Sequence, residues 1–204
     1  MIAIIDYGVG NLFSLTCSFR SIGADICVTS DPEVIAAAER IVLPGVGAFE
    51  DAARKLRESG LDKVIKAECA KGKALLGICL GMQMLFEKSY EYGEHEGLGL
   101  IKGSIRPIAD VIGEGLKIPH IGWNALHFGE KKDELFKYIG EGDCVYFVHS
   151  YYGAECDESV IATAEYGAEL TAAVRSGNVC GVQFHPEKSE RVGLAILRAF
   201  CEIN

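Results

Sequence analysis

Several features that mark particular classes of protein are scarce in this chain of 204 residues. No apolar run approaches the ~20 residues that a membrane helix needs, so we expect no membrane span. Basic residues number 20 against 29 acidic ones, and the formal net charge of −9 argues against a nucleic-acid-binding surface. The first residues, MIAIIDYGVGN, lack a basic region and an A-x-A cleavage site, so we expect no signal peptide.

The eight cysteines include no C-x-x-C pair and follow no regular spacing. This pattern disfavours a zinc site or a disulfide framework and favours free thiols in a reducing compartment, so we expect a cytoplasmic protein. Linkers, repeats and low-complexity segments are also missing, and the length suits one domain with a sizeable core. We therefore predict a single domain over residues 1–204.

Short apolar segments alternate with helical patterns through the first half of the chain. Strands are predicted at 2–6, 25–29, 40–45 and 73–78, and helices at 11–22, 32–39, 48–58 and 61–71. This alternation predicts an α/β fold with a parallel sheet and helices on both faces. The second half is β-rich, and we predict that its strands extend the same sheet in an antiparallel or mixed manner. A last amphipathic helix is predicted at 190–202, after Ser189 as N-cap.

Cys79 stands between two glycines in LLGICLGMQ, where a predicted strand gives way to a helical pattern. The form G-x-nucleophile-x-G is typical of a sharp strand-to-helix turn, because small residues two positions either side relieve crowding. Such a turn lifts the thiol at the sheet edge where open α/β sheets bind ligands, and the start of the helix favours the thiolate. The backbone N–H of Leu80 is placed to bind an oxyanion. The alternative is a buried structural cysteine.

The segment QFHPEKS supplies a histidine and a carboxylate after an apolar strand. A thiolate nucleophile needs an imidazole to move protons and a carboxylate to orient that imidazole, and His185 and Glu187 fit these roles. No residues follow metal-ligand spacing, so we predict no metal site. In LPGVGAF, the N–H groups of Val46 and Gly47 could complete an oxyanion hole, or the segment is a plain turn. The G-x-G of DYGVGNLF lacks the third glycine of a dinucleotide site.

Together, GICLGMQ and FHPEKS resemble the triad class of glutamine amidotransferases, whose glutaminase domain uses Cys, His and Glu. Four further motifs, IAIIDYGVGNLFS, LPGVGAF, IPHIGWN and YFVHSYY, are similar to the glutaminase subunits of imidazole glycerol phosphate synthase. The resemblance spans essentially the whole chain. It implies a flavodoxin-like, three-layer α/β sandwich, no cofactor, and a place in histidine biosynthesis.

The resemblance also implies roles for individual residues. Cys79 would be the nucleophile, His185 the acid and base, and Glu187 the group that orients the imidazole. Around them, the resemblance assigns oxyanion donors (Leu80, Val46, Gly47), a contact to the α-substituents of glutamine (Gln83) and the lining of the glutamine pocket (His149, Ser150, Tyr151).

A partner protein is implied as well. Glutamine would be hydrolysed through a γ-glutamyl thioester, and the ammonia would pass to a (β/α)8 cyclase subunit that makes imidazole glycerol phosphate and an aminoimidazole ribotide. Candidate interface residues are Asn11, Trp123, Tyr146 and Lys188. For Trp123, a position in the core is an equally supported alternative.

Three other functions remain open at this point. The chain could be a cysteine hydrolase of the same fold that acts alone on a peptide or γ-glutamyl bond. It could be a binding or scaffold module that has lost catalysis, although the intact Cys79, His185 and Glu187 argue against this. It could also be the glutaminase of another synthase, such as pyridoxal phosphate synthase.

Overall fold

The computed structural model describes residues 1–113 and 115–203. Its helices are α1 (Leu12–Ser21), α2 (Pro32–Ala37), α3 (Phe49–Glu58), α4 (Leu61–Ala70), α5 (Leu80–Met84) and α6 (Glu190–Glu202), with the 3-10 helices η1 (Ile108–Asp110), η2 (Glu134–Phe136), η3 (Asp157–Ser159) and η4 (Pro186–Lys188). Its strands are β1 (Ile2–Ile5), β2 (Ile26–Thr29), β3 (Arg40–Gly45), β4 (Ala74–Cys79), β5 (Phe86–Ser89), β6 (His95–Glu96), β7 (Ile101–Pro107), β8 (His120–Ala125), β9 (Cys144–His149), β10 (Tyr151–Ala154), β11 (Val160–Glu165), β12 (Glu169–Ser176) and β13 (Val179–Val182).

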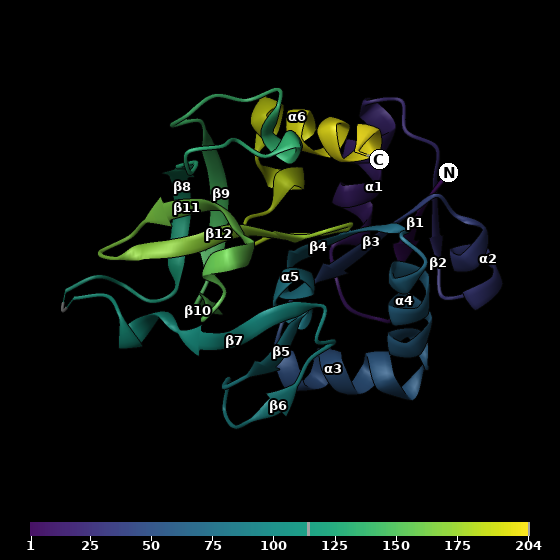
Figure 1. Cartoon of the computed structure of the whole chain (residues 1–204), viewed down its shortest axis with the longest axis horizontal. Coiled ribbons are helices and arrows are strands. Elements are labelled where there is room, and N and C mark those ends of the chain that lie inside the picture. Colours follow the sequence, from purple (N-terminus) through teal and green to yellow (C-terminus); the bar gives the residue numbers. More distant parts are fainter. Residues whose placement is uncertain (114, 204) are drawn as a thin grey trace.

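The central sheet has seven strands in the order β11-β12-β13-β4-β3-β1-β2. The strands from β13 to β2 are parallel to one another, whereas β12 and β11 run antiparallel at one edge. Helices α1 and α6 lie on one side of this sheet, and α3 and α4 lie on the other (Figure 1). The prediction of a mixed, mostly parallel sheet in a three-layer α/β sandwich is therefore confirmed.

Alternate residues of the inner strands divide between two buried clusters, one on each face of the sheet. In β1, Ile2 and Ile4 pack in the cluster that contains Phe200 of α6, and Ala3 and Ile5 pack in the cluster on the opposite face. A strand buried on both faces carries a continuous apolar run instead of an alternating one. This explains why the segment IAII was recognisable as an inner strand from the sequence alone.

Side chains at two helix starts behave differently. The Asn11 side chain accepts a hydrogen bond from the backbone N–H of Ser14 at 3.3 Å and caps α1 as predicted. Ser189 also precedes its helix as predicted, but its hydroxyl does not cap α6. It donates to the carbonyl of His185 at 2.6 Å and accepts from the backbone N–H of Tyr146 at 3.0 Å. Ser189 therefore fastens the segment after β13 to β9.

The prediction that the strands of the second half all extend the central sheet is wrong. Only β11, β12 and β13 join it, whereas β7 and β10 pair with β5 and β6 in a second, four-stranded sheet, and β8 and β9 form a two-stranded ladder. The helix after Cys79 is short: α5 has five residues, and the chain continues into β5. Alternation of residue type identifies a strand, but it does not identify the strand's partner.

The cysteines do not pair: all eight are free thiols. Within residues 1–113 and 115–203, no helix combines the length and apolarity needed to cross a bilayer. Over the same ranges, no group of three or more His, Cys, Asp or Glu side chains is arranged to hold a metal ion.

Candidate active site

Three neighbouring strands end beside Cys79. Strand β4 lies between β3 and β13, and the parallel register places Gly45 opposite Cys79 and Val182 opposite Ile78. Because parallel strands end at the same edge of a sheet, the loop after Gly45 and the segment after Val182 both reach the cysteine.

The backbone turns sharply at Cys79, as the sequence predicts. Cys79 has φ 55° and ψ −113°, a conformation that costs a non-glycine residue ~1–3 kcal/mol. A Cβ on Gly81 would lie 1.9 Å from the carbonyl oxygen of Leu43, and a Cβ on Gly77 would lie 2.7 Å from the carbonyl oxygen of Gly81. Glycine is thus required on both sides of the cysteine, because the backbones of β3, β4 and α5 come into direct contact there.

His185 and Glu187 are buried together next to the cysteine. The Nδ1 atom of His185 lies 2.8 Å from Oε1 of Glu187, and the side chains are 3% and 4% exposed. The carboxylate accepts the Nδ1 proton, which leaves Nε2 for the side of Cys79. Burial disfavours the imidazolium, but hydrogen bonds to Cys79 and Glu187 and their charges outweigh it and raise the pKa of His185 to about 10. At neutral pH the imidazole therefore carries a proton that it can donate.

The second oxygen of Glu187, Oε2, is buried and receives no hydrogen bond from the described residues. It belongs to a side chain that borders a small cavity of about 10 Å³, together with Asn11 and Val46. A cavity of this size has room for about one water molecule. The backbone N–H of His185 donates to the carbonyl of Tyr146 at 2.9 Å, so β9 fixes the backbone at His185.

A larger cavity of about 520 Å³ opens beside the thiol, within the size range of small-molecule sites. Of the residues predicted from the sequence, its lining includes Val46, Gly47, Cys79, Leu80, Gln83, His149, Ser150, Tyr151 and His185. Every residue predicted for oxyanion or substrate binding therefore lies at this one cavity. Glu187 lies behind His185.

Val46 and Gly47 follow β3 directly and line the cavity. Gly47 has φ +96°, in the region that favours glycine. A Cβ placed there would meet no heavy atom within 4 Å, so backbone conformation and not crowding requires the glycine.

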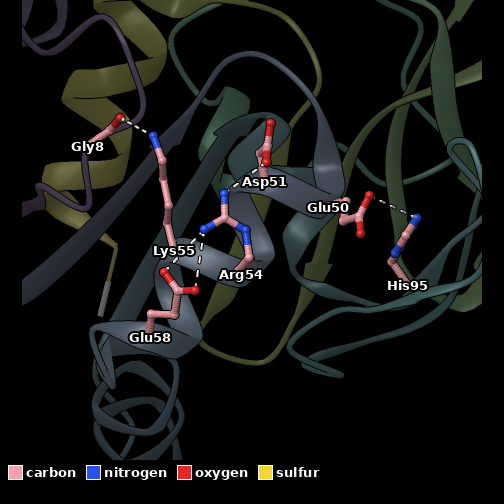
Figure 2. A network of polar contacts seen from close by, with 7 residues as sticks. All are labelled: Gly8, Glu50, Asp51, Arg54, Lys55, Glu58 and His95. Atoms are coloured by element: carbon pink, nitrogen blue, oxygen red, sulfur yellow. Dashed lines mark hydrogen bonds and ion pairs between the residues drawn. The ribbon is translucent and has the colours of Figure 1, made fainter.

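The loop after β3 is tied to the N-terminal segment. The hydroxyl of Tyr7 donates to the carbonyl of Pro44 at 2.8 Å. Burial, with a smaller effect of the charge on Cys79, raises the pKa of Tyr7 well above its ordinary value, so the phenol keeps its proton and remains a donor. The next residue is held as well, because Nζ of Lys55 donates to the carbonyl of Gly8 at 3.1 Å (Figure 2).

Two buried glutamines connect the cavity wall to the nucleophile. Nε2 of Gln83 donates to Oε1 of Gln183 at 3.0 Å and to the carbonyl of Tyr151 at 3.3 Å. Nε2 of Gln183 in turn lies 3.8 Å from Sγ of Cys79, where an N–H donor stabilises negative charge on sulfur. Gln183 was not among the residues predicted for the site. Its place follows from the parallel pairing of β13 with β4, which brings the end of β13 beside Cys79 and which no local sequence pattern encodes.

Glu91 lines the cavity and was also not predicted. Its Oε2 atom accepts a hydrogen bond from the backbone N–H of Phe49 at 2.8 Å. Burial raises the pKa of Glu91, although the bond from Phe49 and the charge of His95 oppose this. A carboxylate in this position suits a ligand ammonium group. No motif in the segment EYGEHEG identified it.

The residues predicted at a partner interface fall into two groups. Trp123 and Tyr146 are cross-strand neighbours on β8 and β9, with their rings edge to face at 6.2 Å, and Nζ of Lys188 lies 5.7 Å from the Tyr146 ring. Trp123 is 49% exposed, so the alternative of a core position is wrong. Asn11 is exposed at the start of α1.

Comparison with known proteins gives the same family along the whole chain. Residues 3–203 match the family model described as glutamine amidotransferase class-I. The imidazole glycerol phosphate synthase subunit HisH of Wolinella succinogenes is 46% identical over 100% of both chains. HisH of Aquifex aeolicus is 48% identical over 97% of this chain and 94% of its own, and HisH of Caldanaerobacter subterraneus is 50% identical over 100% and 98%.

Solved structures share the fold at lower identity. A structure titled as a glutamine amidotransferase has a TM-score of 0.76 at 20% identity, covering 99% of this chain and 98% of its own. A chain of PurLQS from Thermotoga maritima has a TM-score of 0.75 at 22% identity, covering 98% and 97%. The chain belongs to the class-I glutamine amidotransferases and, among them, to the family of the HisH subunits of imidazole glycerol phosphate synthase.

Proposed function

We propose that this chain is the glutaminase subunit of an imidazole glycerol phosphate synthase, in which it hydrolyses glutamine to glutamate and ammonia for histidine biosynthesis. The observation that carries this proposal is the arrangement of Cys79, His185 and Glu187 at one edge of the sheet, beside a cavity of about 520 Å³. The full-length likeness to HisH subunits supports it over the glutaminase of another synthase and over a hydrolase that acts alone.

The first half-reaction forms a thioester. The Cys79 thiolate attacks the side-chain amide carbon of glutamine, and the backbone N–H groups of Leu80 and of the loop at Val46 and Gly47 bind the oxyanion. The His185 imidazolium donates its Nε2 proton to the amide nitrogen, the C–N bond breaks, and ammonia leaves.

The second half-reaction releases glutamate. Neutral His185 takes a proton from a water molecule, and the resulting hydroxide attacks the thioester carbon. The tetrahedral intermediate expels the Cys79 thiolate, and the imidazolium is restored beside Glu187. The two half-reactions together consume glutamine and water and release glutamate and ammonia.

We assign the α-substituents of glutamine to Gln83 and Glu91, which both line the cavity. The partly buried carboxylate of Glu91 suits the α-ammonium group. The strip His149, Ser150 and Tyr151 forms the adjoining wall. These contacts hold the side-chain amide toward Cys79.

The ammonia is used by a partner protein. Free ammonia is mostly protonated at neutral pH, and ammonium is no nucleophile, so direct transfer to a second active site is favoured. We assign this site to a (β/α)8 cyclase subunit that docks on the exposed residues Trp123, Lys188 and Asn11 and on the half-buried Tyr146. The aromatic pair with its half-exposed indole is typical of an interface anchor.

Glutamine hydrolysis measured with the chain alone, and again with the cyclase subunit of the same organism and its nucleotide ligand, tests this function. We expect glutamate release that depends on Cys79 and rises when the liganded partner is added. Equal turnover in both conditions would contradict the assignment to a partner-dependent subunit. Absence of glutamate release in both would contradict the glutaminase itself.

A further inference from the structure

Two buried histidines form a chain of hydrogen bonds behind the proposed glutamine pocket. Nδ1 of His120 lies 2.9 Å from Nε2 of His149, and Nδ1 of His149 lies 2.9 Å from the carbonyl oxygen of Tyr151. At the outer end, Nδ2 of Asn124 lies 3.4 Å from Nε2 of His120. The histidines are 3% and 6% exposed, and His149 lines the cavity while His120 stands behind it.

The groups at the two ends of this row of hydrogen bonds, the Tyr151 carbonyl and the Asn124 amide, fix which atom donates in each bond. The carbonyl of Tyr151 can only accept, so Nδ1 of His149 carries a proton and, in a neutral ring, Nε2 accepts. The Asn124 amide is oriented by its other contacts, because Nδ2 donates to the carbonyl of Glu165 at 2.7 Å and Oδ1 accepts from the N–H of Ala125 at 2.8 Å.

Asn124 therefore presents an N–H to His120, whose Nε2 atom must accept it. The remaining nitrogen of His120, Nδ1, then donates to Nε2 of His149. The two ends require the same arrangement, in which both rings are neutral and both carry the proton on Nδ1. In water, histidine favours the other tautomer, with the proton on Nε2.

These hydrogen bonds leave no acceptor for an additional proton. If Nε2 of His149 were protonated, its N–H would face the Nδ1–H of His120. If the extra proton were instead on Nε2 of His120, that N–H would face the N–H of Asn124. Burial lowers the pKa of His120, and burial together with the charges of His120 and His185 lowers the pKa of His149 to about 4. The ring of His120 is also stacked between Phe147 and Tyr166, at 4.9 and 4.1 Å between centroids.

We propose that His120 is a positioning residue that locks His149 in the Nδ1–H tautomer, and that His149 thereby holds the carbonyl of Tyr151 and the pocket wall from His149 to Tyr151 in place for glutamine. The function of that wall rests on the glutaminase activity proposed above. The Tyr151 carbonyl also accepts from Gln83 at 3.3 Å, so two donors orient the same peptide. His120 touches no reacting atom and acts only through its neighbour.

Imidazole nitrogen NMR of the ¹⁵N-labelled protein reads the tautomers directly and needs no enzymatic activity. We expect Nδ1–H for both His120 and His149, whose signals are assigned by their loss in H120F and in H149F, with H127Q as the control. The control removes an exposed histidine that bonds Glu141. Nε2–H on either ring in the wild-type protein would overturn the proposal, whether or not the chain proves to be a glutaminase.

Two substitutions separate positioning from packing. H120F keeps a stacked ring but removes the donor, whereas H120N keeps an amide N–H near the position of Nδ1. In the complex with the cyclase, we expect H120F to raise KM for glutamine by about five- to tenfold, the value of about one hydrogen bond, with kcat nearly unchanged. H120N should restore most of the affinity, and H127Q should match the wild type.

The same KM in H120F and H120N, or a loss confined to kcat, would overturn the role of the donor. If H120F fails to fold, the wild-type tautomers and the KM of H120N still decide the question: Nε2–H on His149, or a tenfold rise of KM in H120N, counts against the proposal.

Discussion

The charge on His185 is set by two neighbouring side chains. Burial alone would keep the ring neutral, but Cys79 and Glu187 raise its pKa to about 10, above the ordinary value of about 6.5. The imidazolium is therefore present throughout the neutral range and is lost only as the pH rises toward the raised value. The charge on Cys79 thus helps to keep on His185 the proton that the leaving nitrogen needs.

We expect Glu187→Gln to move the alkaline limb of activity to lower pH. The substitution removes the negative charge that raises the pKa of His185 and leaves only a neutral amide oxygen as acceptor, so the imidazolium is lost at a lower pH in the variant. The pH profile of kcat/KM for glutamine, measured for the complex, checks this. An unchanged alkaline limb, or a shift to higher pH, would contradict the role given to the carboxylate.

At the scale of secondary-structure elements, the site depends on how closely β3, β4 and α5 approach. Gly81→Ala should destabilise the fold by about 3 kcal/mol, at the upper end of overpacking costs, because its Cβ would lie 1.9 Å from the carbonyl oxygen of Leu43. Gly129→Ala is the matched control, since a Cβ there meets nothing within 4 Å. Urea unfolding gives both values, and equal midpoints would show that the backbones are not in contact.

The loop that carries Val46 and Gly47 depends on the segment before α1. Tyr7→Phe removes the hydrogen bond to Pro44 while keeping the ring, and we expect kcat to fall about fivefold with little change in KM. The reason is that this loop faces the reacting carbonyl and not the α-substituents. Arg54→Met is the control, because among the described residues Arg54 forms ion pairs only with Asp51 and Glu58, on the exposed face of α3 (Figure 2). An unchanged kcat in Tyr7→Phe would show that the hydrogen bond from Tyr7 to Pro44 does not position the loop for catalysis.

The sequence predicted those parts of the fold and site that depend on local pattern. The turn at Cys79 follows from its glycine spacing, and the inner strands follow from their apolar runs. Gln183 and His120 were missed because their partners are set by strand pairing, which alternation does not encode. Glu91 was missed because it follows β5, a strand that was not predicted, and no local pattern places that segment at the cavity.

At the scale of the whole molecule, one ladder joins the pocket to the proposed docking surface. Strands β8 and β9 pair His120 with His149 at one end and Trp123 with Tyr146 three residues along. We expect Trp123→Ala to weaken binding of the cyclase subunit by about 2 kcal/mol or more, as for an interface anchor, with little loss of folding stability. Calorimetric titration and thermal unfolding measure the two quantities. A core tryptophan would instead cost ~3–5 kcal/mol of stability, and that result would contradict the interface role.

In the proposed function, glutamine hydrolysed at Cys79 supplies ammonia to a partner that makes imidazole glycerol phosphate. The most direct test is to measure formation of that product by the complex, with wild type or Cys79→Ala, supplied with glutamine or with an ammonium salt at alkaline pH. We predict that Cys79→Ala reduces glutamine-dependent synthesis by about a thousandfold or more and leaves ammonium-dependent synthesis at the wild-type rate. Glutamine-dependent synthesis that persists in Cys79→Ala would contradict the account.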